Sequence, residues 1–258
     1  MLLMGDNVLV EGNIIGLDAT GASIVANGSS GIAIGGSNGT IGGTTAAARN
    51  VISGNANNGI TTGNGTGNVI SGNYIGTNAA GNAARGNSNT GIYITSGATG
   101  TVVGGSVAGA GNVISANYNN GITVYANGTV IKGNYIGVNA LGNGSLANSS
   151  SAIYLIANSA VVGGNTSTQR NVLSGNGGSG VYIDGSSNTV IGNYIGLNAA
   201  GTNHIANAVD GVHVVNGSGN IIGTANSGEG NVISGNATYG IELEAPSTGT
   251  VIKGNYIG

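Results

Sequence analysis

The sequence has no cysteine, tryptophan or phenylalanine, and Pro246 is the only proline among its 258 residues. Without cysteine there is no disulfide framework, and with only two histidines no zinc site is expected. Only 5% of the residues are charged, and the five basic residues are spread along the chain. A nucleic-acid-binding protein would show a basic stripe, so no nucleic-acid partner is expected. No apolar run reaches the roughly 18 residues that a membrane span needs.

Glycine, by contrast, is abundant, with 54 copies. Collagen would need glycine at every third position together with much proline, and neither is present. Disorder would need few β-branched residues, yet valine and isoleucine recur throughout the chain. The composition therefore favours short buried strands joined by tight turns in which glycine and asparagine take positive φ angles.

An internal repeat of about sixty residues organises the chain. The string GNYIG or GNIIG starts at positions 12, 72, 133, 192 and 254, and NVISGN or a close variant starts at 50, 112, 171 and 231. A third string, GIxI, occurs twice in each unit, about thirty residues apart. We expect one β-solenoid domain over residues 1–258, with super-repeats at about 12–71, 72–132, 133–191 and 192–253 and partial turns at both ends.

Two further apolar strands lie between consecutive GIxI strings, such as Val69-Ile70 and Tyr74-Ile75. Three short strands per thirty residues predict an all-β parallel solenoid of about eight turns, with two turns in each super-repeat. At about 4.8 Å between stacked strands, such a rod would be roughly 40 Å long. An alternative with three smaller turns per unit remains open. The asparagine before each Val-Ile pair suits a left-handed turn, and stacked asparagines there could form hydrogen bonds from turn to turn.

These three strings resemble those of the right-handed parallel β-helix repeat proteins, the superfamily that includes pectate lyases and polygalacturonases. The resemblance covers the whole chain and is greatest to the repetitive β-helices of large bacterial surface and secreted proteins. It implies a right-handed parallel β-helix and a secreted or cell-surface location. It implies no single activity, because one fold carries many functions.

The catalytic motifs of that superfamily are absent. The chain has no NTD sequence and no DD pair of the polygalacturonase kind, and most of its eight acidic residues are scattered. The glycine-rich nonapeptide that stacks calcium sites is also missing. We therefore expect no enzymatic activity, no metal and no cofactor.

One outer surface of the predicted solenoid nevertheless gathers polar and aromatic side chains. In GIxI the two flanking residues face the core, so the residue x and the residue two places after it face outward. The first outward column is Ala33, Thr61, Tyr93, Thr123, Tyr154, Tyr182, His213 and Glu242. The second is Gly35, Gly63, Thr95, Tyr125, Ile156, Asp184, Val215 and Glu244. We call seven of these residues, with Asp210 at their edge, the tyrosine–acid face: Tyr125, Tyr154, Tyr182, Asp184, His213, Glu242 and Glu244.

Three interpretations of this face are open. It could bind a polysaccharide, with tyrosines packing on sugar rings and acids bonding to hydroxyl groups. Glu242 or Asp184 could instead act as a general acid or base beside His213. Or tyrosine and threonine simply fit exposed strand positions and the charges keep the surface hydrated.

The leading hypothesis for function is a structural rod: a cell-surface stalk, an adhesin segment or a fibre subunit. The chain carries no amphipathic helix that would cap either end, so its end strands offer free backbone groups. The expected partner is a second copy stacked head to tail, or flanking repeats of a longer chain. The alternative hypothesis is a carbohydrate-binding or polysaccharide-cleaving β-helix that uses the tyrosine–acid face.

Overall fold

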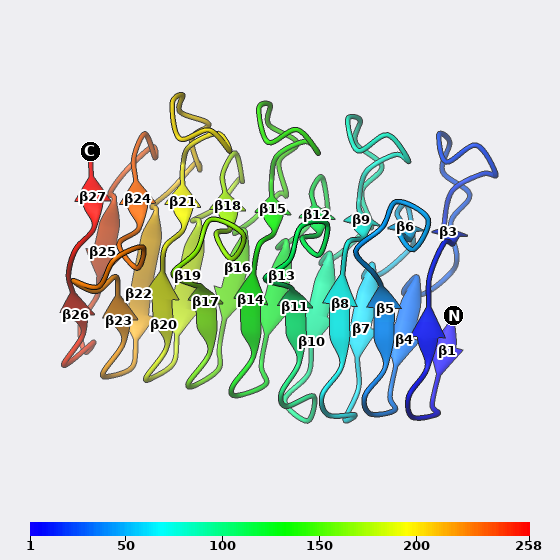
Figure 1. Cartoon of the computed structure of the whole chain (residues 1–258), viewed down its shortest axis with the longest axis horizontal. Helices are drawn as coiled ribbons and strands as arrows, with labels where there is room; N and C mark the ends of the chain where they lie inside the picture. Colours follow the sequence, from blue (N-terminus) through cyan, green and yellow to red (C-terminus); the bar gives the residue numbers. More distant parts are fainter.

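The computed structural model describes residues 1–258 as a right-handed parallel β-helix of about eight turns, with three short strands per turn. Figure 1 shows the turns stacked along one axis, with the N-terminus and the C-terminus at opposite ends. Three parallel sheets of nine strands each form the sides of the rod. No helix of the chain is long and apolar enough to span a membrane.

The GIxI strings form sheet A. Its strands are β1 (Leu2–Leu3), β4 (Ile32–Ile34), β7 (Ile60–Thr62), β10 (Ile92–Ile94), β13 (Ile122–Val124), β16 (Ile153–Leu155), β19 (Val181–Asp184), β22 (Val212–Asn216) and β25 (Ile241–Leu243).

The second strand of each turn lies in sheet B. Its strands are β2 (Leu9–Val10), β5 (Thr40–Gly42), β8 (Val69–Ser71), β11 (Val102–Gly104), β14 (Val130–Lys132), β17 (Val161–Gly163), β20 (Thr189–Ile191), β23 (Ile221–Ile222) and β26 (Val251–Ile252).

The strands from NVISGN and GNYIG alternate in sheet C. They are β3 (Ile14–Ile15), β6 (Val51–Ile52), β9 (Tyr74–Ile75), β12 (Val113–Ile114), β15 (Tyr135–Ile136), β18 (Val172–Leu173), β21 (Tyr194–Ile195), β24 (Val232–Ile233) and β27 (Tyr256–Ile257).

The strand register confirms the thirty-residue turn. Ile92 pairs with Ile122, and Ile122 pairs with Ile153 on the next turn. The alternative with three smaller turns per unit is therefore wrong. The first residues of the GIxI strands form one inward aliphatic ladder, fully buried except at its last member, which is partly buried: Ile60, Ile92, Ile122, Ile153, Val181, Val212 and Ile241.

The register breaks once on the outer face. Ile183 pairs with Val214, but Asp184 then pairs with Asn216, so Val215 has no partner on β19. An extra residue in β22 makes a β-bulge, which shifts the strand by one position. The predicted second column is therefore wrong at Val215, because counting residues from GIxI assumes that no strand contains an insertion.

Two ladders of asparagine side chains, buried except at their ends, run along the rod and confirm the predicted turn-to-turn hydrogen bonds. In the first ladder each Nδ2 donates to the next Oδ1, at 2.8 to 3.1 Å: Asn13, Asn50, Asn73, Asn112, Asn134, Asn171, Asn193, Asn231 and Asn255. The second ladder is bonded in the same way: Asn27, Asn55, Asn87, Asn117, Asn148, Asn176, Asn207 and Asn236.

The expected left-handed backbone at these asparagines is wrong, because none of the ladder residues has a positive φ. Glycines at the strand ends take that conformation instead. Gly76, for example, has a φ of 89°, and a Cβ there would lie 2.0 Å from the carbonyl oxygen of Ser115. Only glycine therefore fits that turn, while the asparagines bond between turns.

Candidate functional site

Four side chains stand in line on the outer surface of sheet A. Tyr154 on β16 pairs with Tyr182 on β19, which pairs with His213 on β22, which pairs with Glu242 on β25. The rings of Tyr154 and Tyr182 are stacked, with centroids 4.7 Å apart and planes 19° apart. The edge of His213 meets Tyr182 at 5.2 Å between ring centroids. From Tyr154 onward, the predicted first column therefore forms a continuous aromatic row that ends in an acid.

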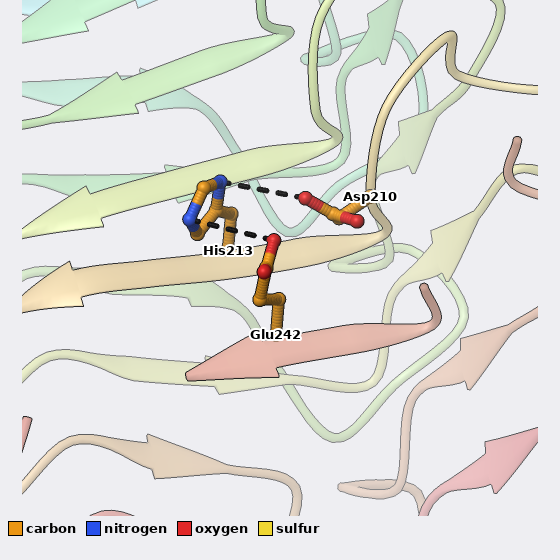
Figure 2. A group of neighbouring side chains, drawn as sticks. All are labelled: Asp210, His213 and Glu242. Carbon is orange, nitrogen blue, oxygen red and sulfur yellow. Dashed lines mark ion pairs between the residues drawn. The ribbon is translucent and has the colours of Figure 1, made fainter. Parts of the chain in front are cut away.

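Three carboxylates surround the imidazole of His213 (Figure 2 shows two of them). Its Nε2 lies 2.8 Å from Oε1 of Glu244 and 3.6 Å from Oε2 of Glu242. Its Nδ1 lies 3.4 Å from Oδ2 of Asp210. Of the predicted face, the structure thus brings His213, Glu242 and Glu244 into one cluster and adds Asp210.

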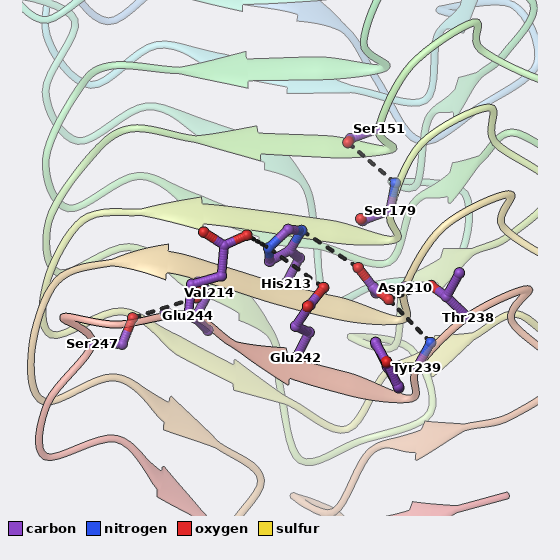
Figure 3. Close-up of polar contacts among 10 residues, drawn as sticks. All are labelled: Ser151, Ser179, Asp210, His213, Val214, Thr238, Tyr239, Glu242, Glu244 and Ser247. Carbon is purple, nitrogen blue, oxygen red and sulfur yellow. Dashed lines mark hydrogen bonds and ion pairs between the residues drawn. The ribbon is translucent and has the colours of Figure 1, made fainter.

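Asp210 is the member that the sequence prediction placed only at the edge. Its side chain is fully buried, and the residue lies two positions before the start of β22. Its Oδ1 accepts hydrogen bonds from the amide of Tyr239, at 3.0 Å, and from the hydroxyl of Thr238 (Figure 3). Its Oδ2 has no hydrogen-bond partner and points toward His213. A buried carboxylate with a free oxygen costs free energy unless a cation faces it.

A signal for Asp210 was present in the repeat. The residue directly before each GIxI string is uncharged in all the other turns: Ser30, Asn58, Thr90, Asn120, Ser151, Ser179 and Tyr239. A charge at this position therefore breaks the repeat, at a position that the strand register places beside His213.

The electrostatics of the cluster favour a proton or a cation near Glu242. Desolvation and repulsion from the nearby Asp210 carboxylate raise the pKa of the Glu242 carboxyl, while His213 lowers it in part. Burial also raises the pKa values of Tyr154 and Tyr182, with a further contribution from Asp184. Both phenols are therefore neutral near pH 7 and can donate hydrogen bonds.

The other end of the row opens into a hollow of about 340 Å³. Tyr93, Tyr125 and Tyr154 line it together with side-chain amides such as Asn89 and Asn119. Because Tyr182 stacks on one side of Tyr154, the opposite ring face is the one that can border this hollow. Thr123 pairs with both Tyr93 and Tyr154, so a small side chain separates the two aromatic ones.

The remaining predicted residues are less closely joined. Tyr125 lies against Tyr93, with ring centroids 5.5 Å apart and planes 46° apart. Asp184, at the end of β19, makes no hydrogen bond or ion pair with the His213 cluster. The predicted face thus divides into a tyrosine-lined hollow, a stacked pair and an acidic cluster.

A separate groove on sheet C has no counterpart in the sequence prediction. It has a volume of about 340 Å³ and is lined by Arg49, Tyr74, Tyr135 and Arg170, among others. The guanidinium of Arg49 lies 4.0 Å from the ring centroid of Tyr74. The repeat hides these arginines, because each precedes an ordinary NVISGN-type strand.

Comparisons with known proteins find a fold relationship only. No described protein family matches the sequence, and neither does any curated protein. Crystal structures of the periplasmic alginate epimerase AlgG are similar in structure. One has a TM-score of 0.56 and 13% identity over 88% of this chain and 47% of that chain. A variant of that enzyme gives 0.55 and 14% identity, over 90% and 46%. The chain thus spans about half the length of these neighbours, and identity this low shows the parallel β-helix alone.

Proposed function

We propose that this chain is a carbohydrate-binding β-helix, and that the outer surface of sheet A binds a neutral glycan. The observation that carries the proposal is the hollow beside the stacked Tyr154–Tyr182 pair, where three tyrosines meet side-chain amides. Aromatic rings pack against the C–H faces of sugars, and amides and phenols exchange hydrogen bonds with hydroxyl groups.

Charge argues for a neutral glycan. Four carboxylates lie on or beside this surface, at Asp184, Asp210, Glu242 and Glu244, and no lysine or arginine lies in any strand of sheet A. An anionic polysaccharide would be repelled, whereas sugar hydroxyls could donate to the carboxylates. The similarity in fold to an alginate epimerase supports a carbohydrate ligand but not its charge, because alginate is itself anionic. The periplasmic location of that enzyme supports an extracytoplasmic location for this chain. The proposal is binding alone and assigns no catalytic step.

A glycan array tests the proposal with the wild-type chain and the double variant Tyr154→Thr/Tyr182→Thr. Threonine occupies the same position at Thr61 and Thr123, so the variant should keep the fold. The matched control is Tyr118→Thr, because Tyr118 is 70% exposed and lies outside sheet A. We expect the wild type and the control to bind the same neutral glycans and the double variant to lose them. A wild-type chain that binds no glycan, or a double variant that binds as well as the wild type, would overturn the proposal.

We also propose a rod role, because both ends of the solenoid expose apolar side chains. At one end Leu2, Met4 and Leu9 are 72%, 70% and 63% exposed. At the other end Tyr256 and Ile257 are 74% and 53% exposed. Stacking of a second copy, or of further repeats, would cover these residues and continue the three sheets.

Sedimentation velocity over a concentration series tests the stacking of copies. Because head-to-tail contacts do not close, we expect open-ended growth with concentration. The variant Leu2→Lys/Tyr256→Lys should shift the chain toward monomer, whereas Leu141→Lys, at a 76% exposed side chain of a lateral loop, should not. A wild-type chain that stays monomeric at all concentrations would contradict self-stacking.

A further inference from the structure

We infer that Asp210, His213 and Glu242 form a binding site for a divalent transition-metal ion, with Zn²⁺ as the probe. Potential ligand atoms of these three residues all lie within 4.8 Å of one another. In Figure 2 both carboxylates point toward the imidazole ring. The ion itself does not depend on the proposed glycan binding, but it would sit at the end of the same surface.

The charge balance of the cluster calls for a cation. Asp210, Glu242 and Glu244 place three carboxyl groups around one imidazole, which can carry at most one positive charge. Water reaches the side chains of Glu242 and Glu244 but not that of Asp210. Asp210 is therefore the acid that most lacks a compensating positive charge. A divalent ion beside the buried Asp210 would supply the missing charge.

The free oxygen of Asp210 identifies where the ion would bind. Its Oδ2 is buried and has no hydrogen-bond partner, although Thr238 and Tyr239 hold its Oδ1. Polar atoms of this kind are rare in folded proteins, since burial without a partner costs free energy. All the remaining turns carry an uncharged residue at this position, so the fold itself does not require the carboxylate.

The two nitrogens of His213 have different partners, as in known metal sites. Nδ1 faces Oδ2 of Asp210, so this nitrogen is the one that would bind the ion; Oε2 of Glu242, which lies 3.6 Å from Nε2, would turn toward Asp210 to complete the set. Nε2 lies 2.8 Å from Glu244 and can donate its proton to that carboxylate. Metal-bound histidines usually hold their other ring nitrogen in this way, which fixes the ring and makes it a better ligand. Glu244 is thus a positioning residue for His213.

The type of ligand selects the class of metal. One imidazole nitrogen and two carboxylates suit Zn²⁺ or a neighbouring transition metal. Such an ion takes four ligands, so three protein side chains leave the fourth position to water. Calcium needs six to eight oxygen ligands, and magnesium keeps most of its waters, so both fit this small set less well. The open position would face outward from sheet A, where Glu242 is about one-third exposed, and could accept a sugar hydroxyl.

Isothermal titration calorimetry with ZnCl₂ tests this site on chelator-treated protein. We expect one Zn²⁺ per chain for the wild type and much weaker binding of Ca²⁺ and Mg²⁺. Asp210→Ser and His213→Thr place the residues of other turns at these positions, as at Ser179 and Thr123, so the fold should tolerate them. Both variants should lose the site, while Glu244→Gln should weaken binding about 10- to 100-fold. The control Glu229→Gln, in the loop before β24, should bind Zn²⁺ like the wild type.

A second readout separates binding at this site from adventitious binding elsewhere. Zn²⁺ should raise the melting temperature of the wild type and of Glu229→Gln, and leave that of Asp210→Ser unchanged. No Zn²⁺ binding by the wild type, or equal binding by Asp210→Ser, would overturn the inference. Repeating the glycan array in chelator keeps the two proposals apart, because tyrosine-dependent glycan binding without Zn²⁺ binding would refute the metal site alone.

Discussion

The asparagine ladder makes a quantitative prediction at Asn112, in the middle of the rod. Its Oδ1 accepts from the backbone amide and the side chain of Asn73, and its Nδ2 donates to Ile70 and to Asn134. The distances are 2.9, 3.0, 2.8 and 2.9 Å, and all four bonds are buried. Asn112→Ala removes all four and leaves the buried Asn73 amide without its side-chain acceptor.

The expected loss follows from these bonds. An orphaned buried amide costs about 1–3 kcal/mol, and each of the other lost bonds contributes about 0.5–1.5 kcal/mol. Because such contributions are not additive, we expect a net destabilisation of about 3–5 kcal/mol, comparable to a truncation in the hydrophobic core. Asn112→Asp should cost at least as much, since it would bury a charge facing two oxygens.

Urea unfolding followed by circular dichroism measures this change. The matched control is Asn119→Ala, which removes an exposed hydrogen bond to Asn89 and should change stability by less than about 0.5 kcal/mol. Native-state hydrogen exchange adds a local readout, because the Asn73 amide should lose its protection in Asn112→Ala. If Asn112→Ala and Asn119→Ala unfold at the same urea concentration, the ladder does not stabilise the rod as argued.

Three further results are expected. Ile122→Ala should cost about 2–5 kcal/mol in urea unfolding and Ile122→Asp should prevent stable folding, because this side chain is fully buried; a mild effect of the aspartate would refute the inward ladder. Hydrogen bonds from the Ala22 amide and the Thr20 hydroxyl lower the pKa of Asp18 to about 2, so an NMR titration should show its midpoint there. The stability that Asp18 provides is present above its ordinary pKa of 3.8 and is lost as the pH falls through about 2. A midpoint near 3.8 would mean that the bonds do not form. Burial raises the pKa values of Tyr154 and Tyr182 in the folded chain. Their contribution to stability is therefore present below about pH 10 and is lost as the pH rises through these raised pKa values. Ultraviolet titration should show two fewer late-ionising phenols in the double threonine variant than in the wild type.

The sequence predicted the fold well because the repeat fixes it at every turn. Positions such as Ile92 and Ile122 recur with one spacing, so local pattern and long-range pairing agree. The same spacing placed Tyr154, Tyr182 and His213 in one column, as the structure has them.

The errors lie where the repeat is interrupted. The bulge at Val215 is one extra residue inside a strand, and a count along the chain cannot tell it from a longer turn. The burial of Asp210 depends on Thr238 and Tyr239 from the next turn, which no local pattern links to it. Glycines rather than asparagines take the left-handed conformation, because the backbones of neighbouring turns approach closely there. These contacts are visible only in three dimensions.

The crystal structure of the chain with an oligosaccharide chosen from the glycan array tests the central claim most directly. The account predicts a neutral oligosaccharide on sheet A, with one sugar ring in the hollow between Tyr93 and Tyr154 and the chain extending past Tyr182 toward Glu242. A sugar bound in the groove of Arg49 and Tyr135 on sheet C, with the sheet A surface empty, would contradict it.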